Sequence, residues 1–157
     1  MKFSLILVGK TTGKPLIQMI DDYVERIAHF APLSVEVIPE LRNAKSLSRE
    51  QQKTQEGKAL LAKIKPSDRV VLLDERGKMF SSQDFATYIE KMQHCGAGRT
   101  VFIIGGTYGF SPEVYSRADD KISLSPMTFS HQMVRLLFVE QLYRAHTILH
   151  NLPYHHE

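Results

Sequence analysis

The sequence predicts an α/β fold in which a parallel sheet is flanked by helices. Short apolar runs of strand length alternate with segments of helical periodicity, and the runs are apolar at consecutive positions rather than at every second one. Strands of that kind are typical of a parallel sheet covered on both faces. The 157 residues contain no linker or low-complexity stretch. We therefore expect one domain, residues 1–157, large enough to bury a core of its own.

The first half of the chain predicts two strands and two helices. Residues 3–8 and 33–38 are apolar runs that we expect to be strands. Residues 15–30 fit a helix because Leu16, Ile20, Val24 and Ile27 recur on one face. Residues 48–65 fit a mostly polar helix.

The second half predicts three strands and three helices. We expect strands at 69–74, 100–104 and 121–124. A helix at 82–94 would open with a capping box formed by Ser81 and Asp84. A short helix would follow Ser111 as N-cap and Pro112 as first residue, and a long helix would end near Pro153.

Ligands of open parallel sheets bind beyond the carboxyl ends of the strands. This rule selects three loops: residues 73–78, 105–110 and 124–130. The second contains Gly105-Gly106-Thr107-Tyr108-Gly109, which fits either a ligand loop or a plain tight turn between a strand and a helix.

Other motifs exclude several classes of site. Gly9-Lys10-Thr11 is not a P-loop, because Ser4 stands where that loop needs its first glycine, and no G-x-G-x-x-G follows a strand. The single cysteine, Cys95, leaves no intrachain disulfide. The amino-terminal apolar run is too short for a signal peptide or membrane span, so we expect a cytoplasmic protein with no membrane association.

The charge distribution favours an anionic partner. The formal net charge is +3, and residues 42–65 hold seven basic against two acidic side chains, a local balance of +5. Lys45, Arg49 and Lys53 recur every four residues, so a helix there would present them on one face. That face fits a nucleic-acid phosphate backbone or simply a solvated surface.

The last helix predicts a homodimer. Between Met133 and Val139 only Arg135 is polar, whereas a helix covering one sheet face should carry a polar outer stripe. A second copy of the chain would cover the remaining apolar side. His146 and His150 have a spacing that can bind a metal, but no carboxylate accompanies them, so we expect a structural role and no metal.

Several segments together resemble the RlmH family, the SPOUT-class methyltransferases that methylate N3 of a pseudouridine in 23S ribosomal RNA. They are the MKFSLILVGK start, DERGK, GGTYG, LSPMTF, HQMVRLLFVEQLYRA and the PYHHE end, and they span nearly the whole chain. The resemblance implies a carboxyl-terminal trefoil knot, S-adenosylmethionine as cofactor, and the helix 69 region of the assembled ribosome as substrate.

The resemblance also implies site residues. The cofactor-binding residues would be Leu73, Gly105, Leu124, Ser125, Pro126, Met127, Thr128 and Phe129. The catalytic residues would be His155 as first candidate for the base that removes the N3 proton, Tyr154 and His156 beside it, and Arg144 as electrostatic stabiliser. Ser130 replaces a proline that is common in the family, and His156 replaces an arginine or lysine.

Two alternatives stay open at the level of sequence. One is a non-catalytic RNA-binding module that uses the basic segment 42–65. The other is a methyltransferase of the same fold that acts on a different RNA position, since pocket shape and flanking contacts set that choice.

Overall fold

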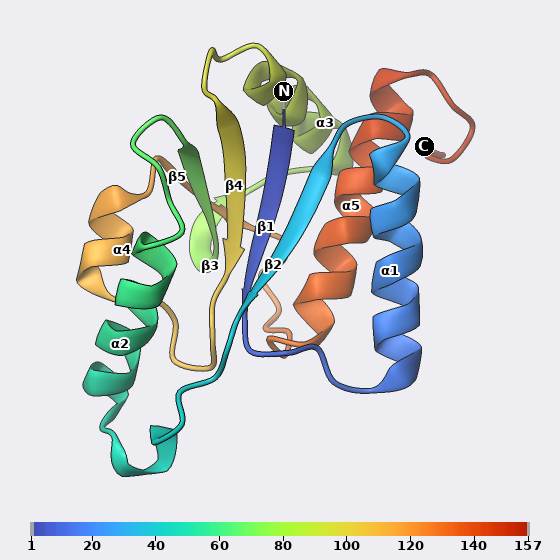
Figure 1. Ribbon diagram of the computed structural model, residues 1–157. Coiled ribbons are helices and arrows are strands. Elements are labelled where there is room, and N and C mark those ends of the chain that lie inside the picture. Colours follow the sequence, from blue (N-terminus) through green and yellow to red (C-terminus); the bar gives the residue numbers. More distant parts are fainter. Residues whose placement is uncertain (1, 157) are drawn as a thin grey trace.

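The computed structural model describes residues 2–156 and has the predicted α/β architecture (Figure 1). The sheet consists of β1 (Lys2–Val8), β2 (Leu33–Ile38), β3 (Arg69–Met79), β4 (Arg99–Ile104) and β5 (Asp120–Ser123). All neighbouring strands are parallel, in the order β2-β1-β4-β3-β5. The helices are α1 (Lys14–Ala28), the 3-10 turn η1 (Ala44–Ser46), α2 (Arg49–Leu61), α3 (Ser82–Gln93), α4 (Pro112–Arg117) and α5 (Met133–Leu149).

Helices cover both faces of the sheet, which explains the continuously apolar strands. Helices α1, α3 and α5 lie on one face, and α2 and α4 lie on the other (Figure 1). Along β1, Phe3, Leu5 and Leu7 belong to the core under the first group, whereas Ile6 and Val8 belong to the core under the second. From Phe3 to Val8, each side chain of the strand is therefore buried whichever way it points.

The helix starts follow the predicted caps with one difference. Ser111 and Ser81 each accept a hydrogen bond from the backbone N–H three residues later. The complete capping box, however, is at α2, where Ser48 and Gln51 bond each other's backbone N–H reciprocally. At α3, the Ser81 hydroxyl accepts a hydrogen bond from the Asp84 N–H, which is one half of the capping box that was predicted there. Helix α2 is also shorter than expected and ends at Leu61.

Strand β3 runs five residues beyond its predicted end at Asp74, so the prediction of a plain loop at 73–78 is wrong. Both Leu73 and Lys78 pair with Ile122 of β5, and the residues between them bulge out of the ladder. Gly77 makes this possible, because a Cβ there would lie 2.5 Å from the Ile122 backbone. The strand continues past Asp74 because residues 74–77 form a bulge, after which Lys78 returns to pair with the same residue of β5, Ile122.

Helix α5 crosses the sheet between α1 and α3, which accounts for much of its apolar surface within one chain. No residue from Val134 to Leu149 is exposed in the described chain. Arg135, the one polar residue of its first two turns, is fully buried and donates to the carbonyl oxygens of Val8 and Gly9 at 2.8 and 2.9 Å. Helices α1 and α3 thus cover part of α5 within one chain, and the homodimer stays a prediction.

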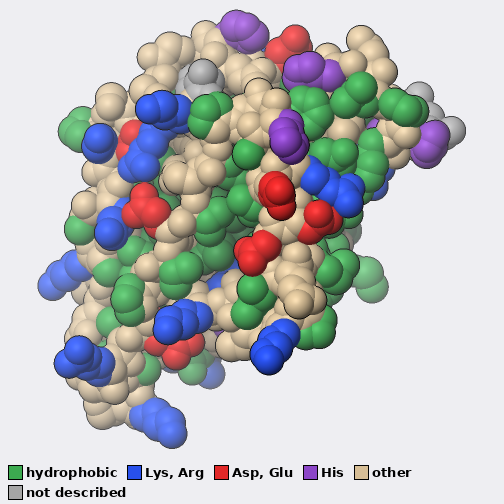
Figure 2. All heavy atoms as spheres, turned by 45° about the vertical axis from the view of Figure 1, so that its right-hand side comes forward, with side chains coloured by type: hydrophobic (Ala, Val, Ile, Leu, Met, Phe, Trp, Pro, Cys, Tyr) green, Lys and Arg blue, Asp and Glu red, His purple; other side chains and the backbone are tan. Residues whose placement is uncertain are grey.

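Some apolar surface is exposed around α1 and the edge strand β2. Val35 and Val37 of the edge strand β2 are 38% and 42% exposed, and Met19 of α1 is 50% exposed. Figure 2, turned towards this side, shows hydrophobic side chains across the middle of the face with charged ones around them. Within residues 2–156, the helices are all too short or too polar to cross a membrane.

Candidate cofactor and catalytic site

A cavity of about 720 Å³ lies at the carboxyl ends of β3, β4 and β5. Its size falls in the range of small-molecule and cofactor pockets. All three loops selected from the sequence contribute to its wall, and seven of the eight predicted cofactor-binding residues line it: Leu73, Gly105, Leu124, Ser125, Met127, Thr128 and Phe129. Pro126 belongs to the same loop but is not among the lining residues. The three loops selected by the strand-end rule thus meet at one cavity, and the residues that the resemblance implies lie in them.

The glycine turn owes its composition to protein packing. A Cβ on Gly105 would lie 2.9 Å from the Phe110 ring, and one on Gly106 would lie 3.1 Å from the Glu56 carboxylate. Gly109 has a φ of +82°, which other residues rarely adopt. The interpretation as a tight turn thus explains the glycines themselves. The interpretation as a ligand loop is compatible with it, since the turn also walls the cavity.

The bulge of β3 adds acidic groups to the cavity that the sequence did not single out. Asp74 and Glu75 both line it, and Asp74 accepts hydrogen bonds from the Arg76 N–H at 2.8 Å and from the Tyr115 hydroxyl. Burial and the neighbouring Asp74 raise the pKa of Tyr115 to about 12, so this tyrosine stays a donor at neutral pH. In the sequence, the DERGK segment was the signal for Asp74 and Glu75. Tyr115 stands in no motif that would have selected it.

The residues of this cavity fit S-adenosylmethionine. Leu73, Ile104 and Leu124 supply apolar walls suited to an adenine ring, whereas Asp74 and Glu75 supply negative charge suited to a sulfonium and an ammonium group. Ser125 fixes its own loop, because its hydroxyl accepts a hydrogen bond from the Met127 N–H at 2.9 Å. The donor set is therefore consistent with a cationic nucleoside cofactor.

The start of α5 is held by the replacement residue Ser130. Its hydroxyl accepts a hydrogen bond from the Met133 N–H at 3.1 Å, and its carbonyl accepts one from the Val134 N–H at 3.1 Å. Serine at this position therefore holds the turn before α5, whose N-cap residue is Gln132. His131 lines the cavity next to it, and its carbonyl accepts a hydrogen bond from Arg135.

The basic segment is only partly aligned. Lys45 lies in η1, before the cap of α2, so it does not share a helical face with Arg49 and Lys53 as predicted. The physical reason is Ser48, which starts a new helix between them. Arg49 and Lys53 do lie one turn apart on α2 and both line the cavity, with the Arg49 guanidinium 5.0 Å from the centre of the Tyr108 ring.

The predicted catalytic residues form a second cluster along the middle and second half of α5. Arg144 donates to Glu140 at 2.5 Å and contacts the His155 Nδ1 at 3.2 Å, and its guanidinium lies 4.7 Å from the centre of the Tyr154 ring. The Tyr154 hydroxyl donates to Glu140 at 3.0 Å. His156 is exposed beside this cluster. Glu140 and Tyr23, which the sequence analysis did not select for the site, complete the cluster.

The two clusters do not meet within one chain. The cavity lies at the start of α5, whereas the tail folds back onto Glu140 and Arg144, which are 7 and 11 residues beyond Met133, or about 10 and 16 Å along the helix. Figure 1 shows the same separation: α5 begins below the sheet, at the strand ends, and the carboxyl terminus lies at the top right.

His146 and His150 take structural positions. His146 is fully buried and stacks on Phe30, with ring centres 5.5 Å apart, and its two ring nitrogens have no hydrogen-bond partner within the described chain. Burial lowers the pKa of His146 to about 4. Cys95 lies exposed just beyond the end of α3.

Comparisons with known proteins agree with this arrangement. A family model described as "Predicted SPOUT methyltransferase" matches residues 1–155. The chain is 60% identical to the ribosomal RNA large subunit methyltransferase H of Phocaeicola vulgatus, 54% to that of Parabacteroides distasonis and 56% to that of Bacteroides fragilis. Each comparison covers 157 residues, the full length of both proteins. The chain belongs to the SPOUT methyltransferase family.

Proposed function

We propose that this protein transfers a methyl group from S-adenosylmethionine to N3 of a pseudouridine in the helix 69 region of 23S ribosomal RNA. The observation that carries this is the cavity of about 720 Å³ built from three strand-end loops, with apolar walls and with Asp74 and Glu75 among its three lining carboxylates. The names of the relatives point to the RNA of the large ribosomal subunit as the substrate class. A cytoplasmic setting follows from that substrate.

A homodimer would complete the active site. His155 contacts Arg144, which lies 11 residues, or about 16 Å of helix, beyond Met133 at the start of α5, so the cavity of one protomer would need His155 of the partner subunit. The partially buried outward residues of α5 and the exposed Met127, Phe129 and Met133 offer apolar surface for such an interface.

Each cluster has a separate task in this site. When bound, S-adenosylmethionine supplies an electrophilic methyl group. Leu73, Leu124 and the backbone of the 124–130 loop would hold the nucleoside, and Asp74 would favour its cationic end. The tail would orient the target base and stabilise the charge that appears when N3 loses its proton.

The test is a methyl-transfer assay with labelled S-adenosylmethionine and either whole ribosomes or free ribosomal RNA. We expect label in the large-subunit RNA, and mass spectrometry of nuclease fragments should find a single 3-methylpseudouridine. Label at another nucleotide would indicate a different target for the same fold. RNA binding without any label would indicate a non-catalytic RNA-binding module.

A further inference from the structure

The carboxyl-terminal tail is tied to α5 through one carboxylate. Glu140 accepts hydrogen bonds from Arg144 at 2.5 Å and from the Tyr154 hydroxyl at 3.0 Å, both on Oε1. Its other oxygen accepts one from Gln141 at 2.8 Å. Only 18% of the Glu140 side chain is exposed. A carboxylate with both oxygens engaged and little solvent contact fixes its partners in orientation.

Arg144 in turn determines the tautomer of His155. A guanidinium has only donors, so the contact of 3.2 Å between the Arg144 Nη1 and the His155 Nδ1 requires a lone pair on Nδ1. A neutral imidazole with a lone pair on Nδ1 carries its hydrogen on Nε2. The free side of the His155 ring therefore presents an N–H donor, whereas a general base needs a lone pair there.

The groups around His155 reinforce this state. Arg144 and Glu140 face it from α5, and Tyr154 precedes it in the tail. On the α1 side, Tyr23 donates to the Tyr154 oxygen at 3.1 Å, because the Tyr154 proton is already given to Glu140. Arg26 lies 5.4 Å from the centre of the Tyr23 ring. Burial, Tyr23 and Glu140 raise the pKa of Tyr154, which leaves this hydroxyl protonated and unable to act as the base.

We propose that His155 donates a hydrogen bond from Nε2 to a carbonyl oxygen beside N3 of the target base, and that Glu140 is the positioning residue that holds Arg144 and Tyr154 for this task. This role rests on the proposed function and changes the expected part of His155 from proton acceptor to donor. The negative charge of a deprotonated N3 is shared with its two flanking carbonyl oxygens. A preorganised donor at one of them stabilises that anion.

The reaction balances without a protein base. The N3 proton passes to water, and the electron pair left on N3 forms the new bond to the methyl carbon. The pair of the former carbon–sulfur bond stays on sulfur, which becomes neutral. The reactive species is thus the N3 anion, whose fraction grows with pH.

The pH profile of the wild-type dimer separates the two roles. With limiting ribosomes and saturating S-adenosylmethionine, we expect the single-turnover rate to rise about tenfold per unit from pH 6.5 to 8.5, because N3 of a uracil ring ionises well above neutrality. If an imidazole acted as the base, the rate would level off near neutral pH, where a free imidazole has lost its proton. A level profile above pH 7 would overturn the donor role. Failure of the wild type to transfer any methyl group would overturn the proposed function instead.

Paired substitutions give a second readout. Glutamine keeps an N–H near the position of Nε2 and cannot accept the proton, so His155→Gln should retain activity within about tenfold of wild type, whereas His155→Ala should lose about 100-fold or more. Equal losses in the two variants would contradict the donor role.

The same logic applies to Glu140. We expect Glu140→Ala to lower kcat about 30-fold with the KM for S-adenosylmethionine unchanged, and Glu140→Gln to recover most of the loss because its amide oxygen still accepts. Glu90→Ala, on the exposed face of α3, is the matched control. A change in the donor KM without a change in kcat would contradict a positioning role.

Discussion

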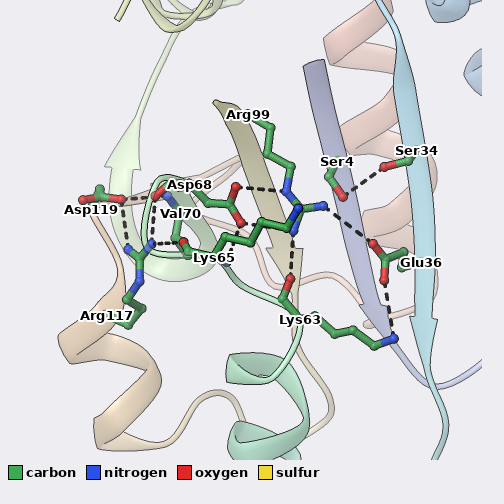
Figure 3. A network of polar contacts seen from close by, with 10 residues as sticks. All are labelled: Ser4, Ser34, Glu36, Lys63, Lys65, Asp68, Val70, Arg99, Arg117 and Asp119. Atoms are coloured by element: carbon green, nitrogen blue, oxygen red, sulfur yellow. Dashed lines mark hydrogen bonds and ion pairs between the residues drawn. The ribbon is translucent and has the colours of Figure 1, made fainter. Parts of the chain in front are cut away.

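The two ends of the sheet are built in opposite ways. At the amino ends of the strands, charged groups are paired: Asp68 accepts from Arg99 at 3.0 Å, and Arg99 also donates to the Lys63 carbonyl (Figure 3). Arg117 joins the same network through the Asp68 and Lys65 carbonyls. At the carboxyl ends, Asp74, Glu75 and Arg49 surround a cavity. One end therefore stabilises the fold, while the other leaves charges available for a ligand.

We expect the largest effect on the cavity end of the sheet from a substitution at Gly77. Gly77→Val places side-chain atoms where the Ile122 backbone lies 2.5 Å from the first of them, so the β3 bulge must open. We expect S-adenosylmethionine affinity to fall more than 100-fold, and the unfolding free energy to fall by about 3 kcal/mol. Calorimetry and urea unfolding measure the two effects. Gly98→Ala is the control, since its Cβ meets Ser67 at an ordinary 3.4 Å. Normal affinity in Gly77→Val would separate the bulge from the site.

A pH titration of stability tests the closed end at His146, which packs against Phe3 near the start of β1. Burial lowers its pKa to about 4, so between pH 6.5 and 4 the unfolded chain binds a proton at this histidine and the folded chain does not. Stability should therefore be full above about pH 6.5 and decline by up to about 3 kcal/mol as pH falls to 4. Urea unfolding at pH 7, 5.5 and 4.5 measures it. His146→Phe should lose this part of the decline, and identical slopes in both proteins would contradict the assignment.

Removing Asp68 should weaken the fold and spare the cavity. Burial opposes its charge, but hydrogen bonds from Arg99 and the Lys65 N–H outweigh it and hold the pKa of Asp68 below its usual value. We expect Asp68→Ala to cost about 2 to 3 kcal/mol at pH 7, with S-adenosylmethionine affinity unchanged. The difference from wild type should shrink as pH falls below about 4, because the unfolded chain then protonates this carboxylate, and it should be lost once the folded-state carboxylate is protonated too. A large loss of affinity would show that the two ends are coupled.

The smallest effect is expected at Tyr115. Tyr115→Phe removes the hydrogen bond to Asp74 in the cavity wall and should weaken S-adenosylmethionine binding about fivefold. Tyr88→Phe is the matched control, because Tyr88 donates to Asp120 at 2.9 Å away from the cavity. The control should lose stability and keep its affinity. Equal affinities in both variants would remove Tyr115 from the site.

The strands and helices were predictable because apolar runs and helix caps are local sequence signals. Apolar runs placed β1, β3 and β4, shorter or interrupted apolar segments placed β2 and β5, and Ser111 with Pro112 marked the start of α4. The strand-end rule then selected the cavity loops without any knowledge of the ligand. The β3 bulge escaped prediction because it depends on the distant Ile122 backbone, which leaves no periodic trace in residues 74–77.

The proposed catalytic residues were predicted from the family resemblance. The hydrogen bonds that join them to Glu140 became visible only in the structure. Tyr154 and His155 are five and six residues beyond the end of α5, and no periodicity connects them to Glu140. Arg144 and Glu140 are a common i, i+4 pair that also fits an ordinary solvated helix face. The knot and the dimer remain predictions, because both concern relations that short segments do not encode.

Arg135 has a consequence for how the protein is made. Its guanidinium donates to Val8 and Gly9, 127 and 126 residues earlier in the chain, and α5 closes the core over Phe102, with the rings of Phe102 and Phe138 4.9 Å apart. A nascent chain that has not yet released α5 from the ribosomal exit tunnel leaves that core open. Contacts of such long sequence separation form slowly. Folding is therefore completed only once α5 has left the tunnel and docks beside the first strand.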